Sequence, residues 1–154
     1  MPSDRGSLRV AFSQTEVYML HDLVARVDRI GNDAILVPQG LTMRDFYMLT
    51  MVSENSGCTH HYLCDCLGLS PASVSLRVKD LSGKGLLEQK VNSRNRKECF
   101  LRLSPKGVRV VRKLNRELSE AFERLLAVLG ENRKEFRESL GLLVQRLRNP
   151  PGSS

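Results

Sequence analysis

Apolar residues recur every three to four positions along most of the chain, which is the period of an amphipathic helix. The helical segments begin at Ser, Thr or Asn residues and are separated by Gly, Asn and Pro, which favour helix ends. Most predicted helices therefore have their own start and stop signals. The predicted helices cover residues 13–35, 42–54, 59–67, 70–82, 104–129 and 132–148.

Two of these helices are short and are joined by a tight turn. Gly68 ends the first helix, and Ser70 followed by Pro71 gives the second helix a cap with proline at its first position. A turn of three or four residues that contains glycine is typical of a helix-turn-helix. Residues 59–82 are therefore predicted to form this motif.

Two short runs follow the motif, at residues 86–91 and 97–103. The second run alternates apolar and polar side chains, which is the pattern of a strand with one buried face. Between the runs lie turn-forming residues and the two arginines Arg94 and Arg96. The pattern predicts a hairpin with a basic tip. The expected fold class is mainly α with a small β-hairpin wing, that is, a winged helix-turn-helix.

The helices on either side of this unit carry more apolar surface than so small a lobe can cover. A surface of this kind is typically buried in a symmetric dimer. We expect one domain over residues 1–154, with a winged helix-turn-helix lobe at residues 41–103. Residues 13–35 and 104–148 are expected to be dimerisation helices, so that the chain forms a homodimer.

The positive charge of the chain is concentrated in one segment. The formal net charge of the chain is +7. Residues 77–113 contain 12 Lys or Arg against three Asp or Glu, which gives a local balance of +9 and leaves −2 for all other residues. Because this segment includes much of the second helix of the motif and the wing, the charge indicates a surface that binds a polyanion. The alternative is a winged helix that binds protein. Protein binding does not require arginines concentrated at the tip of the wing, so the charge favours the first interpretation.

Several function classes find no support in the sequence. No run approaches the ~20 consecutive apolar residues of a membrane helix, and no secretory leader pattern is present, so a cytoplasmic protein is expected. The segment Cys58-x-His60-His61-x-x-Cys64-x-Cys66 contains zinc-ligand types, but Cys64 lies on the core face of its helix, where a packed thiol is expected and no metal. No glycine-rich phosphate loop or catalytic motif occurs, so neither an enzyme activity nor a cofactor is expected.

Five motifs in the central part of the chain carry a family resemblance. They are Leu41-Thr42-x-x-x-Phe46-x-x-Leu49, Leu63-Cys64-x-x-Leu67-Gly68-Leu69-Ser70-Pro71-Ala72-Ser73-Val74-Ser75, Leu81-x-x-Lys84-Gly85-Leu86-Leu87-Glu88, Asn95-Arg96-Lys97 and Leu101-x-Leu103-Ser104-Pro105-Lys106-Gly107. In order and spacing they resemble the multiple-antibiotic-resistance regulator (MarR) family. The resemblance implies a two-fold dimer, usually a repressor, that binds double-stranded DNA at pseudo-palindromic operators. It also implies release from DNA by a small molecule or by oxidation.

The resemblance further implies which residues meet DNA. In the family the second helix of the motif enters the major groove and a wing arginine reaches the adjacent minor groove. The wing arginine implied here is Arg96, with Arg94 beside it. Serine hydroxyls at a helix N-terminus suit phosphate, and Arg77 can reach guanine or phosphate. The implied groove-facing residues are Ser70, Ala72, Ser73, Ser75, Leu76, Arg77 and Lys79.

The wing departs from the family pattern in two places. Asn95 stands where the family usually has an Asp that holds the wing arginine, and Asn92 stands where a second Asp is common. The wing therefore loses two acids that would face phosphate. We expect binding that is less selective for sequence and more dependent on salt.

Two hypotheses concern how DNA binding is switched. Met43, Tyr47 and Met51 form a second apolar stripe on the helix at 42–54, which either packs against neighbouring helices or lines a pocket for a mostly apolar effector. Cys66 occupies an exposed-looking position, and an oxidant-sensing thiol there is the alternative to a small-molecule effector.

Overall fold

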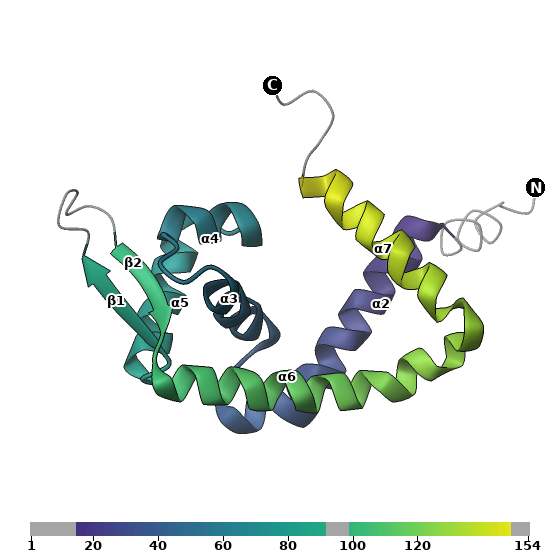
Figure 1. Cartoon of the computed structure of the whole chain (residues 1–154), viewed down its shortest axis with the longest axis horizontal. Coiled ribbons are helices and arrows are strands. Elements are labelled where there is room, and N and C mark those ends of the chain that lie inside the picture. Colours follow the sequence, from purple (N-terminus) through teal and green to yellow (C-terminus); the bar gives the residue numbers. More distant parts are fainter. Residues whose placement is uncertain (1–14, 92–98, 149–154) are drawn as a thin grey trace, which may run out of the picture. The chain divides into compact units, whose positions relative to one another are not determined.

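The computed structural model describes residues 15–91 and 99–148, and it confirms the predicted fold class, because these residues are mainly helical with one two-stranded antiparallel hairpin (Figure 1). The chain divides into two compact units between Glu117 and Leu118, within α6, and each unit is described by itself. The elements are α2 (Glu16–Gly31), α3 (Met43–Glu54), α4 (His60–Leu67), α5 (Pro71–Gly83), β1 (Leu87–Val91), β2 (Cys99–Leu103), α6 (Pro105–Leu126) and α7 (Arg133–Arg148).

Helix α2 begins directly after Thr15, whose hydroxyl accepts a backbone N–H of the first turn at 3.4 Å. After α2 the backbone stays helical but changes type, first to a π-helical turn over Asn32–Leu36 and then to a 3-10 turn over Val37–Gln39. The predicted break is confirmed at Gly40, which takes a φ of 68° that favours glycine. The change of helix type was not predicted from the sequence.

The start of α3 is fixed by hydrogen bonds from two directions. Thr42 Oγ accepts the backbone N–H of Asp45 at 3.3 Å, and Asp45 Oδ2 accepts the backbone N–H of Thr42 at 2.8 Å, which completes a capping box. The side chain of Asn32 accepts the backbone N–H of Met43 at 2.7 Å. These bonds satisfy donors that the first turn of a helix otherwise leaves unpaired.

The predicted helix-turn-helix is formed by α4 and α5, which contact each other. The hydroxyls of Thr59 and Ser70 cap the two helices, and Pro71 occupies the first position of α5, as predicted. Gly68 ends α4 with a φ of 61°. The buried side of α5 consists of Val74, Val78 and Leu81, none more than 1% exposed.

The hairpin is anchored to the helices through Leu101 in β2. This residue is fully buried while its two neighbours are exposed, which confirms the predicted alternation. The N–H of Leu101 donates to the carbonyl of Cys58, and its carbonyl accepts the N–H of Gly57, each at 2.8 Å. The wing base is therefore tied to the segment that joins α3 and α4. The tip, with Arg94 and Arg96, lies outside the described residues.

The junction between the hairpin and α6 is tightly packed around Ser104. The Ser104 hydroxyl donates to the carbonyl of Gly85 at 2.6 Å and accepts the backbone N–H of Gly107 at 2.9 Å, which confirms the predicted cap. A Cβ atom on Gly107 would overlap the carbonyl oxygen of Leu86. Glycine is therefore required at this position so that α6 can approach the strand.

The second unit consists of the end of α6, a 3-10 segment over Ala127–Asn132 and α7. The guanidinium of Arg133 donates to both carboxylate oxygens of Glu123, at 2.6 and 2.8 Å, and this pair lowers the pKa of Glu123. The sequence led us to expect a buried apolar stripe on α7, but in the single chain most of this stripe is exposed. The exposed members are Leu140, Leu143, Val144 and Leu147.

An apolar face of this kind is typically covered by a second surface, such as that of a partner protomer. Whether residues 13–35 and 104–148 serve as dimerisation helices stays a prediction. Across residues 15–91 and 99–148, no helix combines the length and the apolar character that a membrane crossing requires.

Candidate nucleic-acid interface

The N-terminus of α5 is exposed and carries two interacting serines. Ser70 Oγ accepts the backbone N–H of Ser73 at 3.2 Å and donates to Ser73 Oγ at 2.9 Å. This arrangement leaves the hydroxyl hydrogen of Ser73 available to a further acceptor. The first N–H groups of a helix also lack partners within the helix, so the N-terminus of α5 favours a negatively charged group such as a phosphate.

The side of α5 that faces away from the core is the surface predicted from the sequence. Ala72, Ser75, Leu76 and Lys79 are exposed on it, and Ser73 is half-buried. Ser70 is exposed directly before the helix. The predicted residues are therefore brought together on one side of one helix, and their contact with DNA stays a prediction.

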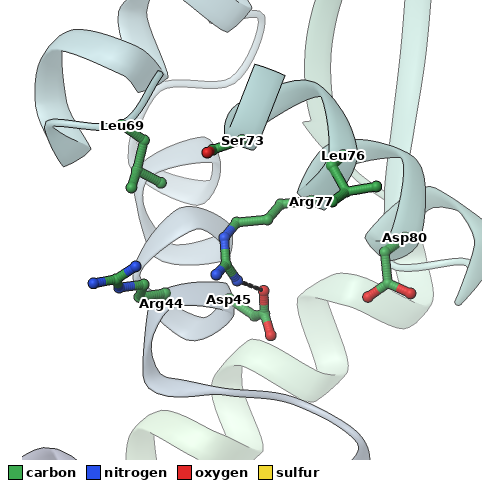
Figure 2. A pocket seen from close by; sticks show the side chains of 7 residues that line it. All are labelled: Arg44, Asp45, Leu69, Ser73, Leu76, Arg77 and Asp80. Carbon is green, nitrogen blue, oxygen red and sulfur yellow. Dashed lines mark hydrogen bonds and ion pairs between the residues drawn. The ribbon is translucent and has the colours of Figure 1, made fainter. Parts of the chain in front are cut away.

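Arg77 differs from the other predicted residues because its charge already has a partner. Its Nη1 atom lies 2.8 Å from Oδ1 of Asp45, as Figure 2 shows, and only 28% of the Arg77 side chain and 7% of the Asp45 side chain are exposed. The other carboxylate oxygen of Asp45 accepts both the N–H and the hydroxyl of Thr42. The ion pair therefore joins α5 to the capping box of α3.

This ion pair borders a surface cavity of about 430 Å³ (Figure 2). The cavity combines charged, polar and apolar side chains, so its lining is not a purely apolar pocket. The residues around it come from the start of α3, the turn before α5 and α5 itself. They are Arg44, Asp45, Leu69, Ser73, Leu76, Arg77 and Asp80.

Two cations at this surface were missed by the sequence analysis. Arg44 is exposed in the first turn of α3 and lines the same cavity as Leu76. Lys84 donates to Asp80 Oδ2 at 2.6 Å and to the carbonyl of Gly40 at 2.7 Å, so it offsets the one acidic side chain of the α5 face. The position of Arg44 two residues after the Thr42 cap was the available signal in the sequence.

The three residues of the predicted effector stripe differ in how deeply they are buried. Met43 belongs to the core with 3% of its surface exposed, Met51 is half-buried and Tyr47 is 45% exposed. Partial burial raises the pKa of Tyr47, and the negative charge of Asp28 raises it further. Asp28 Oδ1 is itself buried without a hydrogen-bond partner within the described residues. The carboxylate of Asp28 therefore acts electrostatically on the hydroxyl of Tyr47.

The cysteines differ in their surroundings. Cys66 is exposed, while Cys58 and Cys64 are partly buried. Burial raises the pKa of the Cys58 thiol, a backbone hydrogen bond partly offsets this effect, and the charge of Cys66 raises the pKa again. Within the described ranges, no three His, Cys, Asp or Glu side chains converge on a point that suits a metal ion.

Comparison with known proteins agrees with the family resemblance. A model of the MarR family matches residues 39–98, which include α3, α4, α5 and β1. Comparison with curated protein sequences gave no match.

Solved structures of regulators have the same fold. The transcriptional repressor CouR bound to a 23-mer DNA duplex matches with a TM-score of 0.76 and 22% identity over 88% of this chain and 95% of that chain. CouR from Rhodococcus jostii RHA1 bound to p-coumaroyl-CoA matches with a TM-score of 0.77 and 18% identity over 92% and 97%. A MarR family protein of Mycobacterium tuberculosis in complex with p-aminosalicylic acid matches with a TM-score of 0.69 and 22% identity over 84% and 98%.

Proposed function

We propose that this chain, which belongs to the MarR family of transcriptional regulators, binds specific sequences of double-stranded DNA as a homodimer and represses transcription. Members of this family are regulators and not enzymes. The observation that carries the proposal is the exposed face of α5, which has a capped N-terminus, serine hydroxyls and the cation of Lys79 on one side. A face of this kind has the donors and the charge that the major groove of DNA requires.

Each part of the interface has a distinct role in the proposal. The N-terminus of α5 with Ser70 and Ser73 binds a backbone phosphate, while Ser75 and Lys79 face the floor and edge of the major groove. Arg44 contacts a second phosphate from the start of α3. Arg96, with Arg94 beside it, enters the adjacent minor groove; the preference of arginine for narrow minor grooves supports this role.

The proposed homodimer sets the geometry of the operator. The apolar side chains exposed on α2, such as Val17 and Val24, and those on α7, such as Leu143, supply surfaces that a second copy would cover. A two-fold dimer with one recognition helix per protomer reads two half-sites whose centres are about 10 base pairs apart.

The experiment begins with selection of binding duplexes from a random DNA library by the purified protein. We expect a pseudo-palindromic sequence, and an affinity whose logarithm falls linearly with the logarithm of salt concentration. Lys79→Ala should weaken binding and reduce the salt slope by about one, whereas Lys134→Ala on α7 is the matched control and should change neither. Absence of any duplex preference, or an affinity that does not respond to salt, would contradict the proposal.

The wing and Arg77 give two further tests of the same proposal. Arg96→Ala should weaken binding to most sequences by a similar factor and flatten the salt dependence, because a phosphate or minor-groove contact carries little sequence information. Arg77→Ala removes a guanidinium that Asp45 already holds, so we expect lower stability and a similar loss of affinity for every duplex, without a change of sequence preference. An Arg96→Ala variant that binds like the parent would show that the wing assignment is wrong.

We further propose that a small, mostly apolar molecule releases the DNA. Support comes from the half-exposed Tyr47, whose ring lies 6.2 Å from the ring of Phe46 and whose hydroxyl can recognise one polar group of a ligand. A ligand can release DNA only if it prefers a dimer geometry in which the recognition helices no longer match successive major grooves. Tyr47→Ala should leave the affinity for the selected duplex nearly unchanged and weaken the response to effectors found by screening. Loss of folding in this variant would assign Tyr47 a structural role.

The exposure of Cys66 supports a second candidate switch, the oxidation of a thiol. If this switch operates, peroxide lowers the affinity of the parent protein for DNA, and Cys66→Ser abolishes the effect while Cys64→Ser does not. DNA binding that is indifferent to peroxide in the parent protein would exclude it.

A further inference from the structure

Leu76 is an apolar side chain in the middle of the exposed face of α5. It is 70% exposed, whereas the other large apolar residues of the helix, Val74, Val78 and Leu81, are at most 1% exposed. The core packing of α5 is therefore complete without Leu76. The Leu76 side chain is therefore available for contact with a binding partner.

Two of the charged side chains near Leu76 on α5, Arg77 and Asp80, are held by other partners. Arg77 is paired with Asp45 at 2.8 Å, and Asp80 is paired with Lys84 at 2.6 Å. Figure 2 shows the Arg77 side chain directed to Asp45, with Leu76 on the neighbouring part of the helix. The group that this part of the surface offers to a binding partner is therefore the apolar side chain of Leu76 and not the guanidinium of Arg77.

We propose that Leu76 recognises the 5-methyl group of a thymine in each operator half-site. This inference rests on the proposed function. The thymine methyl is the one apolar group that base edges offer in the major groove, so it is the group that an exposed leucine can cover favourably. A guanine or cytosine edge beside Leu76 would lose water without gaining a hydrogen bond, which is unfavourable.

The surroundings of Leu76 favour DNA over a protein partner. Arg44 lines the same cavity, Lys79 lies one turn further along α5, and Ser73 lies one turn before Leu76 with a hydroxyl hydrogen to donate. The cations and the hydroxyl donor can bind DNA phosphates, while the leucine side chain between them can contact a base methyl group. A protein partner would need a larger apolar patch around the leucine than this face provides.

The experiment uses the duplex that the full-length protein selects from a random library, with thymine replaced by uracil at one position at a time. Uracil removes only the methyl group and keeps the base pairing. We expect that replacement at one position of a half-site lowers the affinity of the parent protein roughly fourfold, on the scale of one apolar carbon removed from the interface. Replacement outside the half-sites serves as the control and should have no effect.

Substitutions of Leu76 test whether this residue makes the contact with the thymine methyl group. Leu76→Ser should bind the thymine and uracil duplexes equally, while Leu76→Met should retain the preference for thymine. Because the side chain is exposed, both variants are expected to fold, and thermal unfolding checks this. A parent protein that selects a specific duplex but tolerates uracil at every position overturns the inference and leaves the proposed function intact. A preference for thymine that persists in Leu76→Ser also overturns it, whereas a parent protein without any duplex preference overturns the proposed function itself.

Discussion

The ion pair between Arg77 and Asp45 predicts a measurable coupling between the recognition helix and α3. Asp45→Ala removes the carboxylate that accepts the N–H and hydroxyl of Thr42 and pairs with Arg77. The chain thereby loses a helix-capping interaction and leaves a mostly buried guanidinium without its partner. Both losses act on the folded state, so the variant is expected to be destabilised.

The magnitude follows from the burial of the pair. Breaking a buried ion pair by removing one partner costs about 3–5 kcal/mol. The Arg77 side chain is 28% exposed and can turn partly to water, so we expect the lower end of this range, about 3 kcal/mol. For a chain of 154 residues this corresponds to a fall in Tm of roughly 10 °C.

The assay is urea unfolding followed by circular dichroism for the parent, Asp45→Ala, Arg77→Ala and the double variant. Protein concentration must be the same in all samples, because a dimer gains stability with concentration. We expect a coupling free energy of about 1–3 kcal/mol between the two positions. Effects of the two substitutions that add within about 0.5 kcal/mol would show that the pair contributes nothing and would refute this reasoning.

The remaining predictions concern other parts of the chain. Gly107→Ala should lower the free energy of unfolding by about 1–3 kcal/mol, because its Cβ would overlap the carbonyl of Leu86; unchanged stability in urea unfolding would contradict this. Leu147→Glu places a charge on a residue that is 83% exposed in the single chain, so light scattering should find a monomer that folds but binds DNA weakly; a dimer with normal DNA affinity would contradict the role of α7. Iodoacetamide should modify Cys66 before Cys58 at neutral pH, because Cys66 is exposed and burial raises the pKa of Cys58; mass spectrometry of timed samples reads the order directly.

Much of the fold was determined by local features of the sequence. The helix starts at Thr42, Thr59, Ser70 and Ser104 depend on side chains that bond to backbone N–H groups a few residues away, so they can be predicted from neighbours alone. The apolar stripe of α5 and the alternation around Leu101 follow from the helix and strand periods. The predicted face of α5 was implied by the resemblance to the MarR family, and the helix period is consistent with its exposure.

The tertiary structure decided which of those exposed side chains already have partners. Asp45 and Arg77 are 32 positions apart, and neither lies in a pattern that marks it as half of an ion pair. Met43 belongs to the stripe for which packing against neighbouring helices and lining a pocket were both open, and it packs in the core. In both cases the outcome depends on how α3 and α5 pack against their neighbours, which brings together residues whose separation in the chain carries no periodic signal. The sequence by itself therefore determined the elements and their outward faces, and the packing of those elements determined that Arg77 is held by Asp45 while Leu76 stays exposed.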